Sequence, residues 1–101
     1  MTEGEFVVVG MAPNPGGAPL ALLARESPDG LVYAGAAMVT LPRPERDQFW
    51  TRTEAMKIRT PVLPELRRTK ASYVRPELRV RAKHLRGEGM LRHGTLQEIV
   101  S

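Results

Sequence analysis

Hydrophobic and basic residues alternate along residues 78–85. A period of two predicts a half-buried strand, because successive side chains leave a strand on opposite faces. The three cations on one face of this strand are Arg79, Arg81 and Lys83. They repel one another in water, and a polyanion lying across the strand would relieve that repulsion. The charges leave open a second interpretation, a solvated strand face that serves solubility.

Three further stretches predict strands in the first forty residues. Residues 6–11, 20–25 and 31–39 are apolar and rich in β-branched or small side chains. Residues 12–19 hold three prolines and two glycines, which do not fit inside a sheet and predict a loop. Residues 27–30 form a Ser-Pro-Asp-Gly turn. This half therefore predicts a three-stranded meander, with close backbone approach at the small residues of the third strand.

The second half of the chain predicts one helix and two more strands. Residues 45–56 are expected to be helical, since Pro44 suits a first turn and apolar residues recur on one side. A short strand is expected near 72–74, ahead of the alternating strand. A helix between the third and fourth strands of a five-stranded Greek-key barrel is the layout of an OB-fold. We therefore predict a mainly β, OB-fold-like single domain over residues 1–101.

Composition and charge narrow the function classes. The chain has no cysteine, which excludes disulfides, thiolate zinc sites and a cysteine nucleophile. It shows neither a signal-peptide pattern nor an apolar run of membrane length, so we expect a cytoplasmic protein without a membrane partner. Residues 1–40 hold one cation and four acids, for a net charge of −3, and residues 41–101 hold fourteen cations and seven acids, for +7. A basic half on a small domain predicts an anionic partner, most simply nucleic acid.

Few side chains of the sequence suggest a catalytic or metal site. His84 and His93 are its two imidazoles, and the sequence indicates no third ligand, so we predict no metal site. No Ser-His-Asp arrangement follows from the spacing. We expect Trp50, Tyr33 and Tyr73 to pack in the core. For the two tyrosines the alternative is stacking on bases, as in OB-folds that bind single strands.

Four segments share their order and spacing with a known family. The first is a strand ending in glycine, Phe6-Val7-Val8-Val9-Gly10. The second is a turn followed by Leu-x-Tyr-x-Gly, Asp29-Gly30-Leu31-Val32-Tyr33-Ala34-Gly35. The third and fourth are Tyr73-Val74-Arg75-Pro76-Glu77-Leu78 and Gly89-Met90-Leu91-Arg92-His93. Together, over roughly residues 5–96, they resemble the C-terminal OB-fold region of ATP-dependent DNA ligases, in particular the bacterial non-homologous end-joining type.

The resemblance implies a domain that grips nicked duplex DNA for nick sealing in repair and recombination. Three departures bear on activity. Residues 36–40 lack the basic residue and glycines usual in the family, and the Arg-x-Asp-Lys element that orients pyrophosphate is absent. The Lys-x-Asp-Gly motif that carries AMP is also absent, because the single Asp-Gly, at Asp29, has Ser27 two positions earlier. The resemblance therefore implies an accessory domain, excised or stand-alone, that is inactive in isolation and works with a separate nucleotidyltransferase domain or subunit.

The resemblance and the basic strand together predict which residues contact the DNA backbone. The predicted set is Arg79, Arg81 and Lys83, aided by Arg67, Arg68, Arg75 and Arg92. We predict a monomer with no catalytic or metal-ligating residue and no cofactor of its own, since ATP and Mg²⁺ are implied only for a complete ligase. Two alternatives remain: a stand-alone module for single-stranded nucleic acid, and a protein–protein module whose cations meet an acidic partner.

Overall fold

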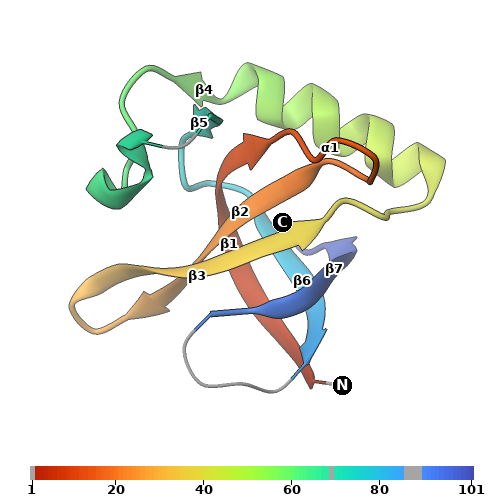
Figure 1. The fold of residues 1–101 in the computed structure, drawn as a ribbon, viewed down its shortest axis with the longest axis horizontal. Helices are drawn as coiled ribbons and strands as arrows, with labels where there is room; N and C mark the ends of the chain where they lie inside the picture. Colours follow the sequence, from red (N-terminus) through yellow and green to blue (C-terminus); the bar gives the residue numbers. More distant parts are fainter. Residues whose placement is uncertain (1, 69, 86–89) are drawn as a thin grey trace.

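Five strands form a closed ring in the computed structural model, which describes residues 2–68, 70–85 and 90–101 (Figure 1). The five are β1 (Thr2–Ala12), β2 (Leu20–Ser27), β3 (Gly30–Met38), β6 (Arg79–Leu85) and β7 (Arg92–Ile99). Their order is β2-β3-β7-β6-β1, and pairing of β1 with β2 completes the circle. All these pairs are antiparallel except β3–β7, which is parallel. The predicted OB-fold barrel is confirmed, but its strands differ from the predicted ones: β7 is not among the predicted strands, and the strand predicted near 72–74 lies outside the ring.

The helix α1 (Arg43–Ala55) connects the third and fourth strands of the ring and lies across one end of the barrel (Figure 1). It begins two residues earlier and ends one residue earlier than the sequence predicts. Pro44 occupies its first turn, where the missing N–H costs no hydrogen bond. Phe49 on its inner face is fully buried and closes that end of the barrel core. None of the helices in the described ranges is long and apolar enough to cross a membrane.

The barrel core is filled by inward-facing side chains of all five ring strands. Along β6 the predicted alternation is confirmed, because Val80 and Ala82 are buried, as is Leu78 just before the strand. The other ring strands contribute apolar side chains to the same cluster, among them Phe6, Val8, Leu23, Ala34 and Leu96. The outward positions of β6 are only half-buried. The strand therefore points one face into the core and presents the other to solvent.

Between α1 and β6 the chain forms a lobe on the outside of the barrel, which we call the basic lobe (residues 57–75). It contains β4 (Lys57–Ile58), a 3₁₀ turn η1 (Pro64–Arg68) and β5 (Ser72–Val74). The sequence predicts an irregular segment up to residue 70, and the structure adds β4 and η1 to it. β5, predicted as a short strand, pairs with β1 on one side and β4 on the other.

A second, smaller apolar cluster fixes the basic lobe to the barrel. Leu63 and Leu66 from the lobe pack against the outward side chains of β1 and β2, at Val9, Leu22 and Ala24. Both tyrosines, Tyr33 and Tyr73, are partly buried in this cluster, as predicted from the sequence. The Tyr73 hydroxyl also donates a hydrogen bond of 2.8 Å to the Leu66 carbonyl oxygen. The lobe is thus anchored by apolar packing that is separate from the barrel core.

The ring closes at the seam between β3 and β7, where Ala37 pairs with Gly94 and Met38 with Thr95. Just before this pairing the Leu91 N–H donates a 2.7 Å hydrogen bond to the Ala34 carbonyl oxygen. Gly35 has φ +120°, and a Cβ atom there would lie 2.9 Å from the Leu91 nitrogen. The close backbone approach predicted for the small residues of the third strand is therefore confirmed.

Candidate nucleic-acid interface

The three predicted cations of β6 all lie on its outward face, between two strands that carry carboxylates. Strand register places Arg81 opposite Glu5 of β1 and Glu98 of β7. Lys83 lies opposite Glu3 of β1. Residues directly opposite on neighbouring strands share a face, so acids flank this basic row on both sides.

Two of these three cations are engaged in ion pairs. The Arg79 guanidinium contacts the Glu26 carboxylate of β2 and lies 3.9 Å from a carboxylate oxygen of Glu5. Arg81 contacts the Glu98 carboxylate. The hydrogen bond from Arg79 lowers the pKa of Glu26, and the same contact raises the pKa of Arg79. The repulsion expected from the sequence is therefore relieved within the barrel itself, without a polyanion.

Positive charge is more concentrated in the basic lobe. Residues 57–75 hold six cations and one acid, Glu65, for a net charge of +5, whereas residues 1–56 sum to −3 and residues 76–101 to +2. The six cations are Lys57, Arg59, Arg67, Arg68, Lys70 and Arg75. The lobe packs on the outer face of β1, β2 and β3 through its apolar cluster. OB-folds commonly bind nucleic acid on the face of their second and third strands.

The lobe cations differ in how they are paired. Lys57 lies 2.9 Å from Glu54, and Arg75 lies 2.8 Å from Glu77. Arg59, Arg67 and Lys70 have no ion pair among the residues that the structure describes. An unpaired cation binds a phosphate without first leaving a carboxylate, which makes these three the better phosphate ligands.

The structure places five of the seven predicted DNA-binding residues, and these five lie on two surfaces. Arg67 and Arg75 belong to the basic lobe, and Arg79, Arg81 and Lys83 belong to the outer face of β6. The backbone of Arg68 ends η1 and that of Arg92 begins β7, but their side chains lie outside the described part of the chain. Arg59 and Lys70, which the prediction omits, belong to the same lobe as Arg67. The local density of charge between residues 57 and 75 is the sequence signal that could have found them.

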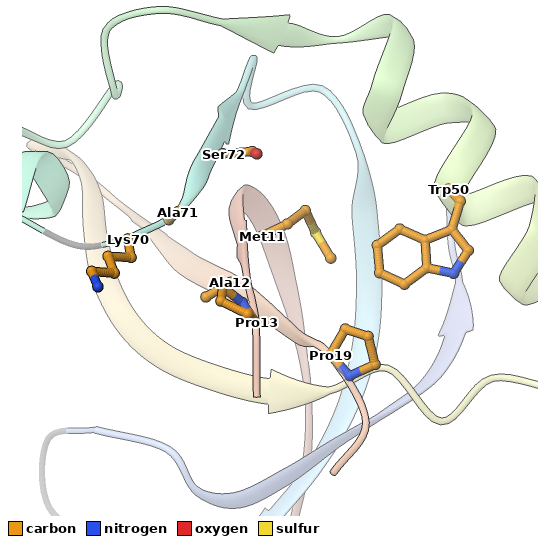
Figure 2. Close-up of a pocket in the computed structure, with 8 residues that line it drawn as sticks. All are labelled: Met11, Ala12, Pro13, Pro19, Trp50, Lys70, Ala71 and Ser72. Carbon is orange, nitrogen blue, oxygen red and sulfur yellow. The ribbon is translucent and has the colours of Figure 1, made fainter. Parts of the chain in front are cut away.

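A groove opens beside the lobe, where α1 faces the loop between β1 and β2 (Figure 2). Its volume is about 410 Å³, and its walls are Met11, Pro13, Pro19, Trp50, Lys70 and Ser72, together with Ala12 and Ala71. Trp50 is predicted to be a core residue, and it does pack against the barrel core. However, it is only half-buried, and its indole also forms one wall of the groove.

Among the described residues, no three His, Asp or Glu side chains come together as a group that could hold a metal ion. We therefore assign no step of metal-assisted phosphate chemistry to the part of the chain that the structure describes. What the geometry offers is a cationic surface and an adjoining apolar groove. Both features suit the binding of a polyanion.

The fold of this chain, an OB-fold barrel with α1 across one end, has counterparts among solved structures. Among solved structures, the chain is similar to mycobacterial DNA ligase D complexed with ATP and MES, with a TM-score of 0.74 and 22% identity. It is also similar to the ligase domain of M. tuberculosis LigD, with a TM-score of 0.76 and 20% identity. No protein-family model matches the chain, and no curated protein matches it.

These similarities extend over 98% of this chain but over only 34% and 35% of the two ligase chains. The chain therefore spans about a third of the length of the structures it resembles. At this level of identity the likeness establishes the fold. It confirms that the chain resembles the OB-fold region of a ligase, as the four sequence segments predict.

Proposed function

We propose that this chain is a DNA-binding OB-fold domain of the ATP-dependent DNA ligase type. In this role it holds nicked duplex DNA, while a nucleotidyltransferase domain in the same polypeptide or in a separate subunit seals the nick. The observation that carries the proposal is the position of the basic lobe on the outer face of a ligase-like barrel. The end-joining pathway of DNA repair and recombination is the setting that the resemblance favours.

In this proposal the domain binds DNA and does not itself catalyse nick sealing. Nick sealing by this class of ligase begins with a lysine amine that attacks ATP and becomes covalently attached to AMP. The sequence contains no Lys-x-Asp-Gly motif to supply that amine. We expect no adenylated form of this chain when it is incubated with ATP and Mg²⁺ alone.

The basic lobe is the main phosphate-binding surface in this proposal, and the β6 face is secondary. Arg59 and Arg67 meet phosphates without breaking an ion pair. Arg79 and Arg81 must first leave Glu26 and Glu98, which offsets part of the attraction. Lys83 has no ion pair among the described residues and is the β6 cation best placed to assist.

Salt-dependent binding tests this assignment with two variants that remove equal charge. Arg59→Gln/Arg67→Gln alters the lobe, and Arg79→Gln/Arg81→Gln alters the β6 face. Anisotropy of labelled nicked and intact duplex is measured between about 50 and 200 mM salt. Each lost phosphate contact lowers the slope of log K against log salt by about 0.9, so we expect the lobe variant to lose about 1.8 and the β6 variant less than half of that.

Three outcomes would contradict parts of the proposal. If the unmodified chain shows no salt-sensitive binding to any DNA, the domain is not a DNA clamp and a protein-docking role replaces it. If the β6 variant loses more slope than the lobe variant, the interface lies on the barrel strands. If a dT oligomer binds more tightly than nicked duplex, the module prefers single strands.

A further inference from the structure

The groove beside the basic lobe has a composition that neither duplex binding nor the barrel core requires. Five of its eight lining residues are Met11, Pro13, Pro19, Trp50 and Ser72. Figure 2 shows the Trp50 indole and the Met11 side chain on either side of the hollow, with Pro19 beneath them. A partly exposed indole, a thioether and a proline ring give the hollow apolar walls of the kind against which an aromatic ring packs.

The charge of the groove is one-sided. Lys70 is the single charged residue among its eight lining residues, and it has no ion pair among the described residues. A smaller hollow of about 140 Å³ continues the groove along α1, sharing Met11, Trp50 and Ser72 with it. That continuation ends at Lys57, which is paired with Glu54. A ligand that suits the groove therefore has an apolar, planar part, which contacts the apolar walls, and an anionic group, which contacts Lys70.

We propose that this groove receives the unpaired end of a single-stranded overhang, with one base against Trp50 and a backbone phosphate at Lys70. This inference rests on the proposed DNA-binding function and extends it from the duplex to the unpaired end beside it. Base–aromatic stacking tolerates any sequence, because every base has a flat π face, so the groove would hold an end without reading it.

Two features favour a nucleotide over an acidic peptide. Lys70 belongs to both the groove and the basic lobe, so a strand leaving a duplex bound on the lobe would meet a cation at the entrance of the groove. The loop between β1 and β2 supplies Pro13 and Pro19, and OB-folds use this loop to contact oligonucleotides. The volume of the groove, about 410 Å³, is within the range of small-ligand sites.

Trp50 is the single tryptophan of the chain, so the tryptophan emission comes entirely from a residue that lines this groove. Three DNAs are compared: blunt duplex, the same duplex with a short overhang, and a dT oligomer. We expect the overhang duplex and the dT oligomer to quench Trp50 and the blunt duplex to leave it unchanged. We also expect the overhang duplex to bind at least about fivefold more tightly than the blunt one, the lower limit of one stacked base.

Variants separate the stacking from the charge. Trp50→Leu is expected to equalise the affinities for blunt and overhang duplex while leaving blunt binding unchanged. Trp50→Phe, which keeps a smaller ring and the fold, retains part of the preference. Lys70→Gln should lower the preference for overhang duplex over blunt duplex. The control Arg46→Gln removes one positive charge from α1, outside the groove, and should leave this preference unchanged. Labelled-DNA anisotropy measures all four.

The remaining outcomes overturn the inference in distinguishable ways. If blunt duplex binds in a salt-dependent way, but the overhang is not preferred and Trp50 is not quenched, the inferred nucleotide site is wrong and the proposed function still holds. Loss of all DNA binding removes both. Quenching by an acidic peptide with apolar side chains, but by none of the DNAs, reassigns the groove to protein docking. An overhang preference that persists in Trp50→Leu places the unpaired nucleotide elsewhere.

Discussion

Gly35 is the residue whose replacement would test barrel closure most directly. Its φ of +120° is a conformation that residues with a Cβ atom rarely adopt, and an added Cβ would lie 2.9 Å from the Leu91 nitrogen. The Leu91 N–H already bonds to the Ala34 carbonyl oxygen across the β3–β7 seam. A methyl group at position 35 therefore has to push the two strands apart where the ring closes.

The cost of Gly35→Ala has three physical sources, and Gly30→Ala shares only the first. A residue held at an unfavourable positive φ costs on the order of 1–3 kcal/mol. Overpacking against Leu91 adds about 1–3 kcal/mol, and loss of its hydrogen bond adds about 1 kcal/mol. Gly30 has φ +114° with no atom within 4 Å of the added Cβ, so its replacement carries the dihedral cost alone. We expect the free energy of unfolding to fall by about 2 kcal/mol or more beyond the Gly30→Ala loss.

Urea unfolding followed by far-ultraviolet circular dichroism measures this difference. Both variants make the same Gly-to-Ala change, so the effect on unfolded-chain entropy cancels between them. With a urea slope of about 2 kcal/mol per molar, the midpoint of Gly35→Ala should lie about 1 M below that of Gly30→Ala. Equal midpoints would refute the reasoning, because they would mean that the Leu91 contact does not constrain residue 35.

Three further predictions concern charge and packing. In Arg79→Gln the pKa of Glu26, measured by NMR, should rise toward its ordinary value of 4.5. In the unmodified chain the Arg79–Glu26 pair stabilises the fold at neutral pH, and this contribution is lost as the pH falls through the lowered pKa of Glu26. An absorbance titration should show that the pKa of Tyr33 lies above its ordinary value of 10.0, chiefly because burial disfavours the charged form. Because the tyrosine of the unfolded chain ionises at lower pH, the free energy of unfolding should fall as the pH rises past 10.0. Leu66→Ala, at a side chain only 2% exposed, should lower the free energy of unfolding by about 2–4 kcal/mol. The control Val62→Ala, at a neighbouring side chain that is 37% exposed, should cost about 0.5 kcal/mol.

Four of the five barrel strands could be predicted from the sequence because their determinants are local, whereas β7, which closes the ring, is not among the predicted strands. The alternation in residues 78–85 fixes which side of β6 is buried, and the small residues around Gly35 mark where two backbones meet. The predicted bounds of the helix agree with α1 to within two residues. Its signals, Pro44 in the first turn and the apolar positions around Phe49, lie close together in the sequence. Periodicity and turn residues carry this kind of information over short distances.

The surface could not be predicted to the same depth, because its properties come from residues distant in sequence. The carboxylate that pairs with Arg79 belongs to Glu26, two barrel strands away, and only the ring closure brings them together. The groove likewise combines Met11, Trp50 and Lys70 from three separate segments. Sequence alone indicated an excess of cations in the second half, but not which of them would be neutralised by neighbours.

The separate apolar cluster beneath the basic lobe has a consequence for how such a domain changes over time. Leu63 and Leu66 hold the lobe from outside, while the barrel core is completed by other residues. Under the proposed function, substitutions at Arg59, Arg67 or Lys70 would therefore alter affinity for DNA without opening a cavity in either cluster. Selection could then change DNA affinity without changing the stability of the fold. The sequences of relatives should therefore differ most in the lobe and least along the strands that enclose the barrel.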